Sequence, residues 1–195
     1  MNDLRNIPEA HRRQAERLAS NVAMRYKRGG SWHDLTWSDY RADVLACAAA
    51  LVEAGIQPGD RVGLLGENRV EWMIADLGIL AAGGVTVSTH AALSPRQVHF
   101  EMHHSGGRWM FVSTAAQCDK VRQVRDELPD LGGVVAFDAA AAGAGVESWD
   151  EFLRRGRQSL SRHQSALVRR EAALARSDLA TIMYTSGTTG NPKGV

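Results

Sequence analysis

Short apolar runs alternate with longer segments of helical periodicity along most of the chain. The apolar runs have the length of buried strands and lie at residues 61–65, 85–89, 109–112, 134–137 and 179–184. The helical segments between them mostly end at glycines and lie at residues 36–55, 69–82, 94–105 and 114–128. This alternation predicts an α/β fold in which parallel sheets, buried on both faces, are flanked by helices.

Capping residues predict where several helices begin. Ser94-Pro95-Arg96-Gln97 combines an N-cap, a proline at the first helical position and a glutamine three residues after the cap. Asn68 is predicted to cap the following helix, with Glu71 returning a bond to the Asn68 amide. Residues 148–151, Ser-Trp-Asp-Glu, form a similar pattern before the polar segment 155–177, which is predicted to be helical in part.

The N-terminal region adds two elements that precede this alternation. Residues 8–20 have the pattern of an amphipathic helix. Apolar pieces at 23–26 and 35–37 flank Gly29-Gly30-Ser31, which predicts a β-hairpin. Near the middle of the chain, the small-residue tract 139–145 is predicted to be a surface loop.

Composition and charge limit the kinds of function that the chain can have. The chain has 195 residues, of which 44% are apolar, so it contains enough apolar surface for one sizeable core. Its net charge is +1, from 23 basic and 22 acidic side chains, which gives no electrostatic reason to expect a nucleic-acid partner. The arginine pairs 154–155 and 169–170 are predicted to lie on solvated helix faces.

Cysteine usage and the N-terminal residues bear on the cellular compartment. Cys47 lies on an apolar helical face, and neither Cys47 nor Cys118 belongs to a Cys-x-x-Cys pair. No apolar leader is present, and no apolar run approaches the roughly 18 residues of a membrane span. We therefore expect a reduced, cytoplasmic setting without a transmembrane segment, whereas peripheral membrane contact remains open.

Candidate chemistry concentrates in the last residues of the chain. The apolar run at 179–184 leads into Thr185-Ser186-Gly187-Thr188-Thr189-Gly190, and Pro192 and Lys193 follow. Small residues allow a backbone to approach a ligand closely, and a nest of amides, hydroxyls and an ammonium group can hold phosphate oxygens. The segment therefore predicts a polyphosphate cradle at the end of a strand. An ordinary connecting loop remains an alternative, but a Walker-type P-loop is excluded by the glycine–lysine spacing.

Residues 182–194, Ile-Met-Tyr-Thr-Ser-Gly-Thr-Thr-Gly-Asn-Pro-Lys-Gly, resemble the signature loop of the adenylate-forming superfamily. That superfamily includes acyl-CoA synthetases, luciferases and peptide-synthetase adenylation domains. The segments 59–72 and 74–87 resemble the acyl-CoA synthetase branch, and within it the long-chain fatty acyl-CoA synthetases. Residues 88–93, Ser-Thr-His-Ala-Ala-Leu, depart from the branch, which commonly has a proline here.

The resemblance implies ATP-dependent activation of a fatty acid to an acyl-adenylate, followed by transfer to coenzyme A with Mg²⁺ as cofactor. By this resemblance, the loop wraps the β- and γ-phosphates, and Asn191 and Pro192 shape its turn. Lys193 supplies charge to the same phosphates or fixes the loop and is the candidate catalytic residue; the alternative is an exposed loop lysine. The phosphate-binding residues implied in this way are Thr185, Ser186, Gly187, Thr188, Thr189, Gly190 and Lys193.

The resemblance also implies that residues 1–195 form the N-terminal portion of a large adenylation domain, which is incomplete here. The adenine, ribose, Mg²⁺ and coenzyme A sites and the C-terminal domain are expected beyond residue 195, so no metal ligands are assigned. Two alternatives stay open: an adenylation domain for another carboxylate, as in peptide synthetases, and an inactive fragment that at most binds nucleotide phosphates. His99 and His103 have a zinc-compatible spacing but lack a third ligand, and His90 receives no role.

Overall fold

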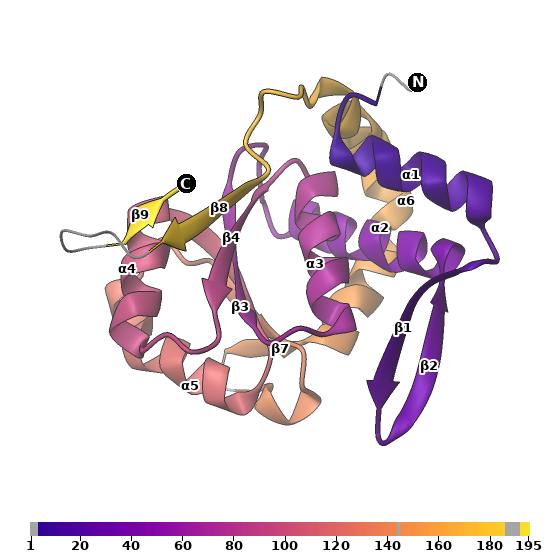
Figure 1. The fold of residues 1–195 in the computed structure, drawn as a ribbon. Helices are drawn as coiled ribbons and strands as arrows, with labels where there is room; N and C mark the ends of the chain where they lie inside the picture. The colour runs from indigo at the N-terminus through magenta and orange to yellow at the C-terminus, as the bar shows by residue number, and fades with distance from the viewer. Residues whose placement is uncertain (1–3, 144, 186–191) are drawn as a thin grey trace.

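The computed structural model describes residues 4–143, 145–185 and 192–195 and shows a sheet with helices on both faces (Figure 1). The described strands form a sheet in the order β7-β6-β5-β3-β4-β8-β9 and a separate hairpin of β1 and β2. Neighbouring strands from β7 to β8 are parallel, and β9 pairs antiparallel with β8. The predicted α/β fold with a parallel sheet is therefore confirmed. The strands are β1 (Val22–Arg28), β2 (Ser31–Thr36), β3 (Arg61–Gly66), β4 (Val85–His90), β5 (Gly107–Val112), β6 (Gly133–Ala136), β7 (Val146–Ser148), β8 (Thr181–Thr185) and β9 (Lys193–Gly194).

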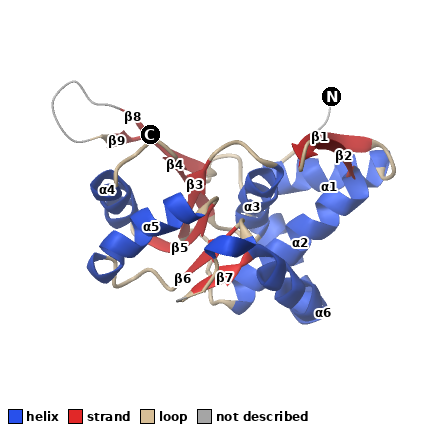
Figure 2. Cartoon of the chain, turned by 90° about the horizontal axis from the view of Figure 1, so that it is seen from below, coloured by secondary structure: helices blue, strands red, loops and turns tan. Residues whose placement is uncertain are grey.

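Helices cover the sheet in two groups, which Figure 2 shows from below. The helices α4 and α5 lie on one face, and α2, α3 and α6 lie on the other, with α1 against α2 and α3. The helices are α1 (Ile7–Leu18), α2 (Trp37–Glu53), α3 (Val70–Ala81), α4 (Pro95–Ser105), α5 (Ala115–Val124) and α6 (Trp149–Ala173). Short 3₁₀ turns occur at Arg125–Glu127 and Ala139–Ala141, the second of them within the tract predicted to be a loop.

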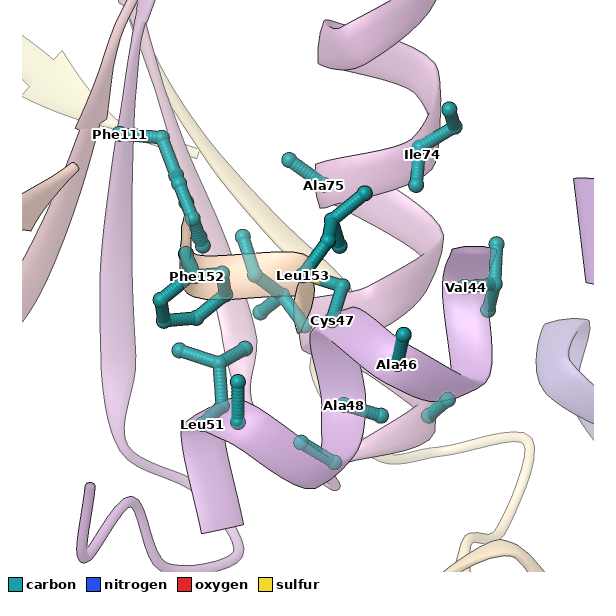
Figure 3. Close-up of a cluster of buried hydrophobic side chains, with 14 of the residues drawn as sticks. Val44, Ala46, Cys47, Ala48, Leu51, Ile74, Ala75, Phe111, Phe152 and Leu153 are labelled. Carbon is teal, nitrogen blue, oxygen red and sulfur yellow. The ribbon is translucent and has the colours of Figure 1, made fainter. Parts of the chain in front are cut away.

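The larger core lies where α2 passes between α3 and α6 (Figure 3). A Cβ on Gly156 would lie 1.9 Å from the carbonyl oxygen of Ala46, and one on Gly78 would lie 2.5 Å from the Cys47 Sγ atom. Glycine at these two positions therefore lets both helices approach α2 closely. The gap between α2 and the sheet is filled by larger side chains, including Phe111 and Phe152.

Residues 155–173 of the polar segment continue α6 without interruption, and the helix ends before residue 177, so the prediction that the segment is helical in part is confirmed. Arg170 Nη1 donates to the carbonyl oxygens of Ile56 (2.8 Å) and Ala82 (2.7 Å), which follow the ends of α2 and α3. Arg155 pairs with Glu147 at 3.1 Å. The prediction of solvated faces was wrong for Arg155 and Arg170, because both are half-buried and bind neighbouring elements. It is confirmed for Arg154 and Arg169, which are exposed.

The start of α3 differs from the sequence-based prediction. Arg69, and not Asn68, occupies the N-cap position, and no side chain caps the helix. Glu71 does not return a bond to Asn68; its carboxylate pairs with Arg69 Nε at 2.8 Å and with Arg28 of the hairpin. Two arginines compete more strongly for a carboxylate than one backbone amide does, since both partners carry charge. By contrast, the capping box predicted for Ser94 and Gln97 is confirmed.

Strand β8 is less buried than its apolar sequence predicted. Its residues alternate between exposed and half-buried positions, and Met183 is 52% exposed. The reason is topological: β8 pairs with β4 on one side, and its other neighbour is the short strand β9. Leu179, the first residue of the predicted strand, lies before β8 and is 65% exposed.

Candidate functional site

The predicted phosphate loop is rooted in the hairpin formed by β8 and β9. Thr185 and Lys193 are directly opposed in this pairing, and the next pair is Tyr184 with Gly194. Met183 and Val195 exchange two backbone hydrogen bonds of 2.9 and 2.8 Å, which extend the pairing. Thr185 and Lys193 are both exposed. Because directly opposed residues project from the same face of a sheet, the Thr185 hydroxyl and the Lys193 ammonium can address one ligand.

The remaining residues of the predicted loop are not part of this geometry. The positions implied as phosphate-binding that lie outside the described residues are Ser186, Gly187, Thr188, Thr189 and Gly190. The structure therefore places the two ends of the loop, whereas the roles of its members stay predictions. Both ends lie at the carboxyl end of β8, which is the edge where parallel α/β sheets bind ligands.

Tyr184 fixes the root of the loop to α4. Its hydroxyl donates to the carbonyl oxygen of Glu101 (3.3 Å) and lies 2.8 Å from His104 Nδ1. With the hydroxyl hydrogen directed to Glu101, His104 must donate its Nδ1 hydrogen to the tyrosine oxygen. The Tyr184 ring also meets the rings of Phe100 and His104 edge to face. Burial raises the pKa of Tyr184, so the hydroxyl stays protonated at neutral pH.

A buried carboxyl group lies in the same helix. Glu101 is 4% exposed, and its Oε2 atom has no hydrogen-bond partner in the part of the chain that the structure describes. Burial raises the pKa of this carboxyl group, since the charged form loses its hydration. Thr89, at the end of β4, is 2% exposed and also has an unpartnered hydroxyl within the described ranges.

A second polar cluster lies between the carboxyl ends of β3 and β5. Glu67 accepts hydrogen bonds from the Ser113 hydroxyl and from Gln117 Nε2, the latter at 2.9 Å. Arg69 Nη1 donates to Asp138 Oδ1 at 2.8 Å and thus closes the cluster on the side of β6. The hydrogen bond from Ser113 contributes most to lowering the pKa of Glu67, so this carboxyl group stays ionised at neutral pH.

This cluster marks the point where the chain changes direction across the sheet. After β3 the chain enters α3 on one face, and after β5 it enters α5 on the other. Such switch points open a crevice at the carboxyl edge in α/β folds. These residues could not be grouped from the sequence, because β3 and β5 are neighbours in space and not along the chain. The available signal was a polar residue just beyond the end of each strand, Glu67 after β3 and Ser113 after β5.

Neither cluster supplies a metal site from the described residues. Within these ranges, no group of three or more histidine, cysteine or acidic side chains is placed to hold a metal ion. The His99 and His103 rings stack at 5.5 Å, and the nearest carboxylate oxygen to His99, on Glu127, lies 4.0 Å away. Cys47 and Cys118 are buried and free. The arrangement thus offers the Thr185 hydroxyl and the Lys193 ammonium at the carboxyl edge, which are donors suited to an anionic ligand.

Comparison with known families agrees with this geometry. The family pattern described as AMP-binding enzyme matches residues 11–195, which is nearly the whole chain. The chain belongs to the AMP-binding enzyme family. The match runs through both ends of the predicted loop, and it confirms the resemblance to adenylate-forming enzymes stated above.

Curated relatives of this AMP-binding enzyme include long-chain-fatty-acid–CoA ligases. One from Mycobacterium tuberculosis is 36% identical over 165 residues, covering 85% of this chain and 26% of the relative. Another from Xenopus laevis is 30% identical over 176 residues, covering 89% of this chain and 23% of the relative. The chain thus spans about a quarter of the length of these relatives.

Solved structures share the fold at lower sequence identity. An anthranilate CoA ligase in complex with anthranoyl-AMP has a TM-score of 0.84 and 23% identity, covering all of this chain and 35% of that one. A structure described as a putative long-chain-fatty-acid CoA ligase from Rhodopseudomonas palustris has a TM-score of 0.71 and 17% identity, with 96% and 42% covered. These similarities show that the chain shares its fold with part of each of these structures.

Proposed function

We propose that this AMP-binding enzyme activates a fatty acid with ATP and transfers the acyl group to coenzyme A. In the first step, a carboxylate oxygen attacks the α-phosphorus of ATP, an acyl–AMP mixed anhydride forms, and pyrophosphate leaves. In the second step, the coenzyme A thiol loses its proton, its sulfur attacks the acyl carbonyl carbon, and AMP leaves. The observation that carries this proposal is the family match over residues 11–195, which includes the loop that follows β8.

The proposed task of the loop is to hold the β- and γ-phosphates while pyrophosphate departs. Negative charge builds up on the leaving group, so donors already aimed at it lower the barrier. The Thr185 hydroxyl and the Lys193 ammonium, which project from one face of the β8–β9 pair, are two such donors. We assign Ser186, Gly187, Thr188, Thr189 and Gly190 to the same cradle from the resemblance. Lys193 contributes charge and is not a proton-transfer group in this proposal.

Mg²⁺ is proposed as a cofactor of the reaction, where it neutralises charge on the phosphates when bound. The described residues provide no group of carboxylates for it. Its protein ligands are therefore proposed to come from outside the described part of this chain.

The acid substrate is proposed to be a long-chain fatty acid. This choice rests on the names of the relatives that are 30–36% identical. An alternative is an aromatic or other carboxylate, since the similar solved structures include an anthranilate CoA ligase. A cytoplasmic setting is proposed as well; among the described helices, none is long and apolar enough to cross a bilayer.

The deciding experiment uses a protein that contains this sequence within a complete adenylation domain and C-terminal domain. Exchange of labelled pyrophosphate into ATP, which requires acyl-adenylate formation, is measured with a panel of acids. Fatty acids should support exchange, and adding coenzyme A should give acyl-CoA and AMP. Exchange with anthranilate or an amino acid but not with fatty acids would favour the alternative, and no exchange with any acid would refute ligase activity. We expect the 195 residues alone to show no ligase turnover.

A further inference from the structure

The hairpin of β1 and β2 projects from the helical side of the molecule (Figure 1). In both whole-chain views it lies on the opposite side from β8 and β9. Gly29 and Gly30, with φ of 57° and 83°, form its turn. Two successive positive φ values are those of a type I′ turn, which gives a tight and well-defined tip.

The outer face of this hairpin carries an exposed aromatic side chain beside a cation. Trp32 is 67% exposed, and it is directly opposite Lys27 in the strand pairing. Directly opposed residues share one face, so the indole and the ammonium group lie side by side. Lys27 has no ion pair in the described ranges of the chain. The hairpin carries three cations against one carboxylate, whereas the whole chain has a net charge of only +1.

The surface continues from the hairpin to the first turns of α3. Between them lies an open cleft of about 690 Å³, whose lining includes Trp32, Trp72 and Met73 together with Arg25 and Lys27. Met73 is 43% exposed. We call Arg25, Lys27 and Trp32, which share the outer face of the hairpin, the hairpin patch. Within the patch, Arg25 pairs with Asp34, which leaves Lys27 as the patch's excess charge; Arg28, on the opposite face of the hairpin, pairs with Glu71 of α3.

We propose that the hairpin patch docks on the surface of an anionic lipid bilayer. Tryptophan combines an apolar ring system with a polar N–H group and is enriched at the level of lipid headgroups. Lysine and arginine near such a surface are attracted by its negative potential. Trp32 then lies among the headgroups, and Lys27 faces lipid phosphates and carboxylates. The adjoining cleft, which Met73 lines, accommodates lipid atoms. Ligase activity is not required for this docking.

The test is partition of the protein into vesicles of phosphatidylcholine, with or without phosphatidylserine, measured by flotation. The patch variants are Trp32→Ala and Lys27→Glu. The matched controls, Val168→Ala and Arg169→Glu, change an equally exposed apolar residue and an exposed cation on α6. Near-ultraviolet circular dichroism and a thermal melt verify that each variant is folded.

Wild-type protein should bind the phosphatidylserine vesicles more strongly than phosphatidylcholine alone, and salt should weaken the difference. Lys27→Glu lowers the charge of the patch by two units. Each unit of charge near an anionic bilayer changes the binding constant by about fivefold, so this variant should bind at least about tenfold more weakly. Trp32→Ala should weaken binding to both vesicle types, and the controls should bind as wild type does. The tryptophan emission of wild type should shift to shorter wavelength on vesicles, and Trp32→Phe should remove that shift.

Absence of binding by the wild-type protein would overturn the proposal. So would patch variants that bind as the α6 controls do, because the contact would then lie elsewhere on the molecule. None of these readings depends on turnover, so failure of this proposal is distinguishable from failure of the ligase assignment.

Discussion

Replacing His11 tests how the N-terminal helix is packed, through the pH dependence of stability. His11 is 6% exposed, and its ring lies 4.6 Å from that of Tyr40 and 5.8 Å from that of Trp37, measured between centroids. Neither ring nitrogen has a hydrogen-bond partner within the described residues. Burial, followed by the nearby Arg41 charge, lowers the pKa of His11 from 6.5 to about 4.

This lowered pKa fixes the sign and size of the effect. Between pH 6.5 and pH 4 the unfolded chain binds a proton that the folded chain does not, so the free energy of unfolding decreases as the pH is lowered. Across the whole interval between the two pKa values, the free energy of unfolding decreases by about 3 kcal/mol. Between about pH 7 and about pH 5 it decreases by about 2 kcal/mol. His11→Phe keeps an aromatic ring of similar size and removes the titrating group.

The measurement is urea unfolding at both pH values for wild type, His11→Phe and the control His90→Phe, which changes an exposed histidine. The free energy of unfolding of His11→Phe should depend on pH less steeply than that of wild type, by about 2 kcal/mol across this interval. The control should follow the wild-type profile. If His11→Phe and wild type have the same pH dependence, the histidine is not buried in neutral form, and the reasoning is refuted.

Two further substitutions test the helix packing and the root of the loop. Gly156→Ala should lower the free energy of unfolding by about 1–3 kcal/mol in denaturation, because the new Cβ meets the Ala46 carbonyl, although alanine favours helices. Ser165→Ala, at an exposed position of the same helix, should change it by less than about 0.5 kcal/mol, and equal values for both would contradict the close approach. Tyr184→Phe removes the hydroxyl that holds the loop to α4 and should weaken ATP binding by about two- to tenfold in calorimetric titration. Tyr26→Phe is its control, and identical ATP affinities would show that this hydroxyl does not position the loop.

Features encoded by a few consecutive residues were predictable from the sequence. Ser94 and Gln97 form the predicted capping box, and the Gly29–Gly30 turn forms the predicted hairpin. In both cases the residues that determine the geometry lie next to one another or within one helical turn along the chain. The parallel sheet was predictable for a related reason, because each buried strand is a continuous apolar run.

Features that depend on distant parts of the chain were not predictable. Glu71 pairs with Arg28, which lies in the hairpin, so its local capping pattern was misleading. The helix α6 was predicted only in part because its buried face includes Gly156 and Ser159, which carry no apolar signal. Glycine is selected there by close contact with α2, a constraint visible only once both helices are in place.

The candidate site also combines features that are encoded locally with features that depend on distant parts of the chain. The composition of residues 185–193 pointed to a phosphate cradle, and the structure places its two ends, Thr185 and Lys193, opposite each other. The attachment through Tyr184 and His104 was not predictable, because the two residues are far apart in sequence. The polar cluster around Glu67 required knowledge of the strand order, which periodicity does not provide.

The central claim is that the loop after β8 binds the phosphates of ATP. Its most direct test is the dissociation constant for ATP of the complete protein after Thr188, Thr189 and Lys193 are all changed to alanine, with Lys27→Ala as the control for loss of a lysine elsewhere. A single charge-assisted hydrogen bond contributes about 1.5–3 kcal/mol, so the triple variant should bind ATP at least tenfold more weakly while its melting temperature stays close to that of wild type. Wild-type affinity in the folded triple variant would contradict the claim.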